Sequence, residues 1–172
     1  MTNYRISDIL KCDNHSNSNH SWNSIESEIG IVFPEDYKWF IDKYGVGAVN
    51  DFLWVISPFC ENENLNSLRL FKLMKDSYEY VKHDNPEEFT FEFYSNGQGL
   101  FPWGITENGD ELYWCFEEER VEIVVFAARY TLIKRYSMSM EEFLSNILTK
   151  AIKCEAFPDD FILDRNYYSL LP

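Results

Sequence analysis

The segment FPWGITENGDELYW, Phe101 to Trp114, contains two tryptophans and an Asn-Gly step between two apolar runs. Asn108-Gly109 is typical of type I′ turns, because both residues tolerate positive φ angles. One run ends near Thr106 and the next begins near Glu111. The pattern predicts a β-hairpin closed by a type I′ turn, in which the glycines serve the geometry of the chain.

The same glycines do not match a phosphate-binding loop. Gly97, Gly99 and Gly104 lack the spacing of a dinucleotide fingerprint, and a strand follows where phosphate binding needs a helix N-terminus. No G-x-x-x-x-G-K-[ST] sequence occurs, and ENGDEL offers too few ligands for a calcium loop. We therefore expect no cofactor.

Apolar residues recur with helical spacing in four segments, each with its own end signals. Gly30 and Gly45 stand where helices end, Pro34 where one begins, and Ser139 to Glu142 fit a capping box. The predicted helices cover Trp22–Ile29, Pro34–Tyr44, about Leu65–His83 and Ser139–Ala151.

Five further segments alternate or are rich in apolar β-formers, and they predict strands. These are Phe52–Ser57, Phe89–Ser95, Leu100–Thr106, Glu111–Phe116 and Val121–Ala127. Helices on both sides of a run of strands indicate an α+β fold, with a largely antiparallel central sheet flanked by helices in a single domain. We expect residues 1–21 to form an N-terminal extension, 22–155 the domain, and 156–172 an aromatic C-terminal tail packed on it.

Charge and cysteine content restrict the class of partner. With 15 basic against 29 acidic residues the net charge is −14, so the chain should repel nucleic acid and attract a basic protein. No apolar run is long enough to span a bilayer, and the N-terminus lacks a secretory pattern. Four separated cysteines indicate free thiols. We expect a cytoplasmic protein with no membrane or nucleic-acid partner.

Catalytic and metal-binding patterns are weak. Cys12, His15 and His20 lie close in sequence, but tetrahedral zinc needs a fourth ligand, so no metal site is predicted. We expect His83 to interact favourably with the dipole at a helix end and not to act as a catalytic base. Asp159 and Asp160 are expected to lie in a loop with their side chains pointing apart, which does not suit general acid–base catalysis. The sequence therefore predicts a protein that is not an enzyme.

Three segments in order resemble one family. They are VFPEDYKWFIDKYGVGAVN (Val32–Asn50), SNGQGLFPWGITENGDELYW (Ser95–Trp114), and EIVVF (122–126) followed by SMEEFL (139–144). Together they are similar to the SUKH superfamily, over about Trp22 to Leu148. The superfamily includes cell-wall assembly regulators of fungi and bacterial immunity proteins.

The resemblance implies an α+β fold and, for a bacterial member, neutralisation of a polymorphic toxin by direct binding. Such toxins are often nucleases. The family's shared residues would mainly maintain the fold; here they are Pro34, Gly45, Gly47, Trp103, Gly104, Gly109, Asp110 and Trp114.

A nuclease needs a basic substrate groove, so an inhibitor with a negative net charge is electrostatically complementary to it. We expect acids flanking the hairpin to take part, although Asp110 could instead hold its own turn. The predicted partner-binding residues are Glu107, Asp110, Glu111, Glu117, Glu118 and Glu119.

Two alternatives remain open at this point. The first is a regulatory or scaffold module that binds an endogenous partner, as implied by the fungal members of the superfamily. The second is a small-ligand binder or hydrolase that uses an aromatic cleft near Trp103 and Trp114. The identity of the binding partner distinguishes the first from an immunity protein, and a bound metabolite would indicate the second.

Overall fold

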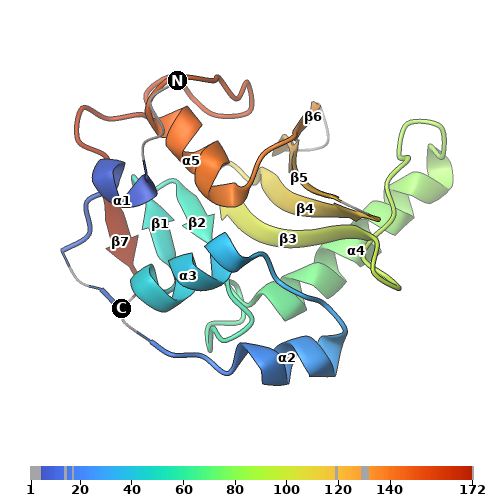
Figure 1. The fold of residues 1–172 in the computed structure, drawn as a ribbon. Coiled ribbons are helices and arrows are strands. Elements are labelled where there is room, and N and C mark those ends of the chain that lie inside the picture. The colour runs from blue at the N-terminus through green and yellow to red at the C-terminus, as the bar shows by residue number, and fades with distance from the viewer. Residues whose placement is uncertain (1–4, 14, 17, 119, 129–131, 172) are drawn as a thin grey trace.

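A single antiparallel sheet forms the centre of the computed structural model, which describes residues 5–13, 15–16, 18–118, 120–128 and 132–171 (Figure 1). Within these residues the sheet has seven strands in the order β6-β5-β4-β3-β2-β1-β7. The strands are β1 (Gly47–Val49), β2 (Leu53–Val55), β3 (Gly99–Thr106), β4 (Glu111–Glu117), β5 (Arg120–Phe126), β6 (Ile133–Tyr136) and β7 (Tyr168–Leu170).

Helices cover both faces of this sheet. Helices α1, α2, α3 and α5 contribute to the core on one face, and α4 packs on the other (Figure 1). Their bounds are α1 (Ile6–Ile9), α2 (Trp22–Ile29), α3 (Glu35–Tyr44), α4 (Ser67–Asp84) and α5 (Met140–Leu148). The predicted α+β class, with an antiparallel sheet flanked by helices in one domain, is confirmed. No helix among the described residues combines the length and apolarity needed to cross a bilayer.

The predicted hairpin is formed by β3 and β4, and both of its faces are buried. Trp103 and Trp114 face α3 and α5, with ring centroids 6.4 Å apart, while Leu100 and Tyr113 face α4. Trp103 is the extra residue of a bulge between Pro102 and Gly104. A bulge changes where side chains point, and here it keeps both indoles in the same core.

The turn of this hairpin differs from the prediction. Gly109 has a positive φ of 84°, but Asn108 does not, so the turn is not type I′. Gly109 N–H donates to Thr106 O at 2.9 Å, and Thr106 N–H donates to Asp110 O at 3.0 Å. A three-residue loop that ends in a left-handed glycine produces this pattern. The side chain of Thr106, bound to Asp110, holds the longer loop in place.

The four predicted helices are present, and α1 was not predicted. The side chains of Ser139 and Glu142 form the predicted capping box at the start of α5. Gly30 ends α2 in the left-handed conformation, and Gly45 follows α3 with a φ of 74°. Pro34 lies one position earlier than expected, because it is the N-cap of α3 and not its first helical residue.

The strand predictions were less accurate. Residues 89–95 alternate like a strand but form none; Phe89 and Phe93 instead pack on Tyr78 of α4, at 5.3 and 5.5 Å between centroids. Strands β1, β6 and β7 were not predicted. Two of them have only three residues, too few for a periodic pattern to show.

Segments near the two ends of the chain, Lys11 and β7, meet at one edge of the sheet. Strand β7 pairs with β1, and Lys11 exchanges backbone hydrogen bonds with the β7 side of the sheet, through Asn166 O and Tyr168 N–H. The ring of Tyr168 is buried, and its hydroxyl donates to Gly45 O at 2.9 Å. Residues on either side of the 22–155 segment therefore complete its sheet.

Replacing Gly47 with alanine should destabilise the protein by about 2 kcal/mol or more, because the added methyl would lie 2.2 Å from Ser169 O in the β7 backbone. Gly97→Ala is the comparison variant: its φ of +89° is unfavourable for alanine, but no atom lies within 4 Å of the added methyl, whereas Gly47 has no positive φ and its cost is steric. Urea unfolding of both variants measures the difference. If Gly47→Ala lost no more free energy of unfolding than Gly97→Ala, the β7 backbone would not be in close contact with Gly47.

Candidate partner-binding surface

The acids predicted to contact a partner divide between the two ends of β4. Glu107, Asp110 and Glu111 lie at its start, and Glu117 and Glu118 at its end. At about 3.3 Å per residue, the two groups are about 20 Å apart. Glu119 lies outside the described residues. The sequence prediction of one acidic group is therefore replaced by two groups with different surroundings.

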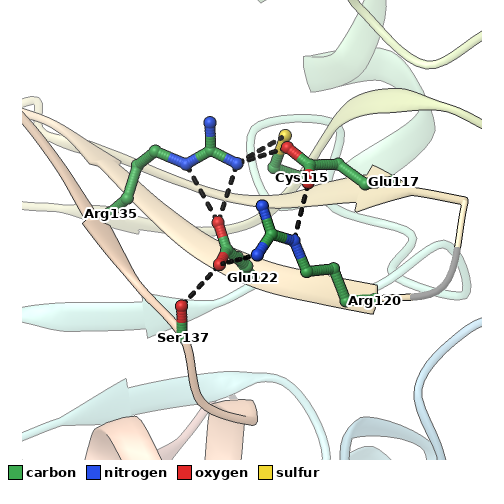
Figure 2. Close-up of polar contacts among 6 residues, drawn as sticks. All are labelled: Cys115, Glu117, Arg120, Glu122, Arg135 and Ser137. Carbon is green, nitrogen blue, oxygen red and sulfur yellow. Dashed lines mark hydrogen bonds and ion pairs between the residues drawn. The ribbon is translucent and has the colours of Figure 1, made fainter.

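At the far end of β4, Glu117 belongs to an ion-pair network that links β4, β5 and β6 (Figure 2). Its carboxylate binds Arg120 at 2.7 Å and Arg135 at 2.5 Å. Glu122 is 4% exposed; it accepts from Arg135 at 2.7 Å and forms a longer ion pair with Arg120 at 3.6 Å. The Ser137 hydroxyl also donates to Glu122 at 2.5 Å.

This network is neutral overall, since two carboxylates share two guanidinium groups. The hydrogen bond from Ser137, followed by Arg135, holds the pKa of Glu122 below its usual value, and Arg135 and Arg120 lower the pKa of Glu117. Both carboxylates are therefore ionised and paired. Of the two predicted residues described at this end of β4, only Glu118 presents an exposed carboxylate without an ion pair.

Cys115 lies beside this network, with its sulfur 4.0 Å from Arg135 Nη2. Burial nevertheless raises the pKa of the thiol, and this effect is larger than the lowering by Arg135. A thiol that stays protonated is a poor nucleophile. The cluster in Figure 2 is a structural ion-pair network and gives Cys115 no catalytic character.

A polar groove of about 580 Å³ runs alongside the network, between α4 and residues 90–99. Its walls carry charges of both signs, from Lys75 and Glu79 of α4 to Glu92 and Arg135. Arg135 lies over the ring of Phe91, 5.7 Å from its centroid. With Glu117 the lining has three acids and two bases, and an excess of one acid is too small to favour a strongly basic partner.

The near end of β4 is different. Trp54, Ile105 and Glu111 stand opposite one another in neighbouring strands, so their side chains project from one face of the sheet. Glu107 accepts from the indole N–H of Trp54 at 2.5 Å, and its own N–H donates to Phe52 O at 3.0 Å. The turns β1–β2 and β3–β4 therefore lie side by side.

Asp51, in the β1–β2 turn, adds a further exposed carboxylate. It accepts from the hydroxyls of Ser169 at 2.7 Å and Tyr167 at 2.8 Å, and these bonds lower its pKa. Glu111 is half-buried, and burial raises its pKa, although a hydrogen bond from the Tyr113 hydroxyl opposes this. None of Asp51, Glu107 and Glu111 forms an ion pair with a described base.

We call Asp51, Trp54, Glu107 and Glu111 the acidic–aromatic surface. Sequence reasoning identified Glu107 and Glu111 but missed Asp51 and Trp54. The signal was Asn50-Asp51, two adjacent residues that both adopt a positive φ of 51° in the β1–β2 turn. Asn and Asp tolerate this conformation better than other non-glycine residues, so the pair could have indicated a turn.

Asp110 is not available to a partner. It is 3% exposed, and its carboxylate accepts from Thr106 Oγ1 at 2.6 Å and from Ala128 N–H at 2.8 Å. These bonds tie the β3–β4 turn to the end of β5. As the sequence analysis allowed, the side chain holds its own turn, and its place among the partner-binding residues is corrected.

The remaining family-signature residues lie in the framework. Gly47 and Gly104 make close backbone approaches, since an added methyl would lie 2.2 Å from Ser169 O and 3.2 Å from Trp54 O. Trp103 and Trp114 are both buried, and their indole nitrogens have no hydrogen-bond partner among the described residues. The two rings therefore contribute by packing and do not line an open cleft.

The other residues weighed as catalytic or metal-binding are dispersed. His20 binds Asp42 at 2.7 Å and stacks on Phe59, while His15 lies against Tyr44. His83 is exposed beside Asp84, and Asp159 pairs with Lys153. Across the described part of the chain, no three His, Cys, Asp or Glu side chains are grouped to hold a metal ion.

Replacing Arg135 with alanine should lower the free energy of unfolding by about 1–3 kcal/mol at neutral pH, because the buried Glu122 loses its nearest cation. Arg120→Ala, at 3.6 Å from Glu122, should cost less. The pKa of Glu122 is lower in the folded than in the unfolded protein. The difference in free energy of unfolding between wild type and Arg135→Ala is therefore fully present above the unfolded pKa, near 4.5, and is lost as the pH falls through the folded-state pKa. Urea unfolding at several pH values would contradict this if the loss were the same throughout.

Comparison with known proteins identifies the family. The family model SUKH_6, described as SMI1-KNR4 cell-wall, matches residues 19–144. The match covers the central hairpin, both ends of β4 and most of α5. No curated protein and no solved structure gave a significant match. Since the match spans well over half of the 172 residues, the chain belongs to the SMI1-KNR4 group of the SUKH superfamily.

Proposed function

We propose that the protein is a non-catalytic immunity protein of the cytoplasm, which binds and neutralises a cognate toxin with a basic surface. The observation that carries this proposal is the family match over residues 19–144, because toxin immunity is common in the SUKH superfamily. A nuclease-type toxin is the favoured target, since its substrate groove must be basic. No nucleic-acid or membrane partner is part of the proposal.

The acidic–aromatic surface is the proposed contact. Of its three carboxylates, Glu107 binds the half-buried indole of Trp54, while Asp51 lies in the adjoining turn and Glu111 two strands away on the same face. Interface anchors are enriched in tryptophan. A cation on the partner can approach both the ring face and the carboxylates. Glu118 adds a separate negative charge at the other end of β4, where Glu117 is held in its ion-pair network.

A regulatory module is the second candidate, because the matched family is described by its cell-wall members. Such a module would use the same surface toward an endogenous basic protein. The two functions differ in their consequence for the cell: an immunity protein protects against a toxic domain, and a regulatory module does not.

Co-expression tests the function. The C-terminal domain encoded beside this gene is expressed with and without the protein, and growth is followed together with co-purification. We expect toxicity that the protein abolishes, with a stable complex. Toxicity that persists despite expression of the folded protein would contradict immunity toward that domain.

Charge reversal tests the surface. Glu107→Lys should lower the association rate with the rescued domain about tenfold at low salt and weaken its salt dependence, because steering depends on the local field. Glu87→Lys is the matched control, since it makes the same change in net charge on the exposed loop after α4. Stopped-flow kinetics compares the two. Equal effects would show that only net charge matters and would remove this surface from the proposal.

A further inference from the structure

A mostly apolar pocket of about 310 Å³ lies between the end of α5 and residues 150–162, beyond the segment that the family model matches. Pockets of this size accept small ligands. Its polar lining is limited to Lys150, Lys153 and Asp159. The apolar lining consists of Ile147, Ile152, Cys154, Phe157, Pro158, Phe161 and Ile162.

Lys150, at the rim of this pocket, has an unfavourable backbone conformation. Its φ is +61°, directly after Thr149, the C-cap of α5. Lys150 N–H donates to Ile147 O at 2.9 Å, and Ala151 N–H donates to Asn146 O at 2.8 Å. This pair of bonds is the Schellman motif, whose left-handed position is usually glycine. A lysine here costs stability, and such a cost often marks a functional position.

The two lysines of the rim have different electrostatic surroundings. Lys153 binds Asp159 at 2.7 Å, so its charge is compensated. The ammonium of Lys150 forms no ion pair or hydrogen bond with any described residue. The pocket lining therefore carries one net positive charge, although the whole chain carries −14. This local reversal of sign favours a ligand with an anionic group.

The floor of the pocket is suited to a hydrocarbon and not to covalent chemistry. Phe157 and Phe161 are 7% and 5% exposed and stack edge-to-face at 5.3 Å between centroids. Burial raises the pKa of the Cys154 thiol, so the sulfur stays protonated and acts as a small apolar group. An apolar chain entering the pocket would meet no unpaired polar atom from these residues.

We propose that this pocket binds a free medium-chain carboxylic acid, with its hydrocarbon chain between Ile147 and Phe161 and its carboxylate on Lys150. The hydrophobic effect supplies most of the affinity, and the Lys150 ammonium selects the anionic head group. This site is independent of the acidic–aromatic surface and of the proposed immunity function.

Titration of the full chain with decanoate tests the proposal, by calorimetry and by NMR of the isoleucine methyl groups. We expect saturable binding that perturbs Ile147, Ile152 and Ile162. Lys150→Gly should weaken decanoate binding about fivefold, since one exposed ion pair is lost. The same change should raise the midpoint of thermal unfolding, because glycine is the preferred residue at a φ of +61°.

Two controls separate the pocket from non-specific binding. Asp159→Asn should strengthen decanoate binding, because it removes a negative charge from the rim and releases Lys153. Neutral decanol should bind wild type and Lys150→Gly equally. The proposal is overturned if decanoate fails to saturate the isoleucine signals, or if Lys150→Gly binds it as tightly as wild type while unfolding at a higher temperature.

Discussion

The structure depends on burial of both faces of the β3–β4 hairpin. On one face Trp103 and Trp114 meet α3 and α5, and on the other Leu100 and Tyr113 meet α4. A sheet with one solvated face could alternate polar and apolar residues, but this hairpin cannot. Its central residues are buried almost without interruption, so every neighbouring element must supply an apolar surface.

Charges at the two ends of β4 follow from what surrounds them. Glu122 is buried, and a buried carboxylate needs compensation, which Arg135 and Ser137 provide. Arg135 and Arg120 then also neutralise Glu117. At the other end no base among the described residues pairs with the carboxylates of Asp51, Glu107 and Glu111, so they keep their negative field and form the surface that we propose for a basic partner.

The pocket beyond α5 shows how a local cost can indicate a site. Lys150 adopts a conformation that glycine would adopt without strain, at the rim of an apolar pocket in an acidic protein. Neither observation alone indicates a ligand. Together they distinguish this pocket from the larger polar groove beside Arg135, whose lining has charges of both signs and one more acid than base.

By itself the sequence determined the class of fold, the central hairpin and most of the helices, because those depend on periodicity and on local caps such as Ser139 with Glu142. It did not reveal β1 and β7, which have three residues each, and β7 is a strand only because it pairs with the distant β1. The acidic surface was also decided by tertiary structure. Composition gives the total charge, but only packing decides that Asp110 is buried, that Glu117 is paired and that Glu107 lies beside Trp54.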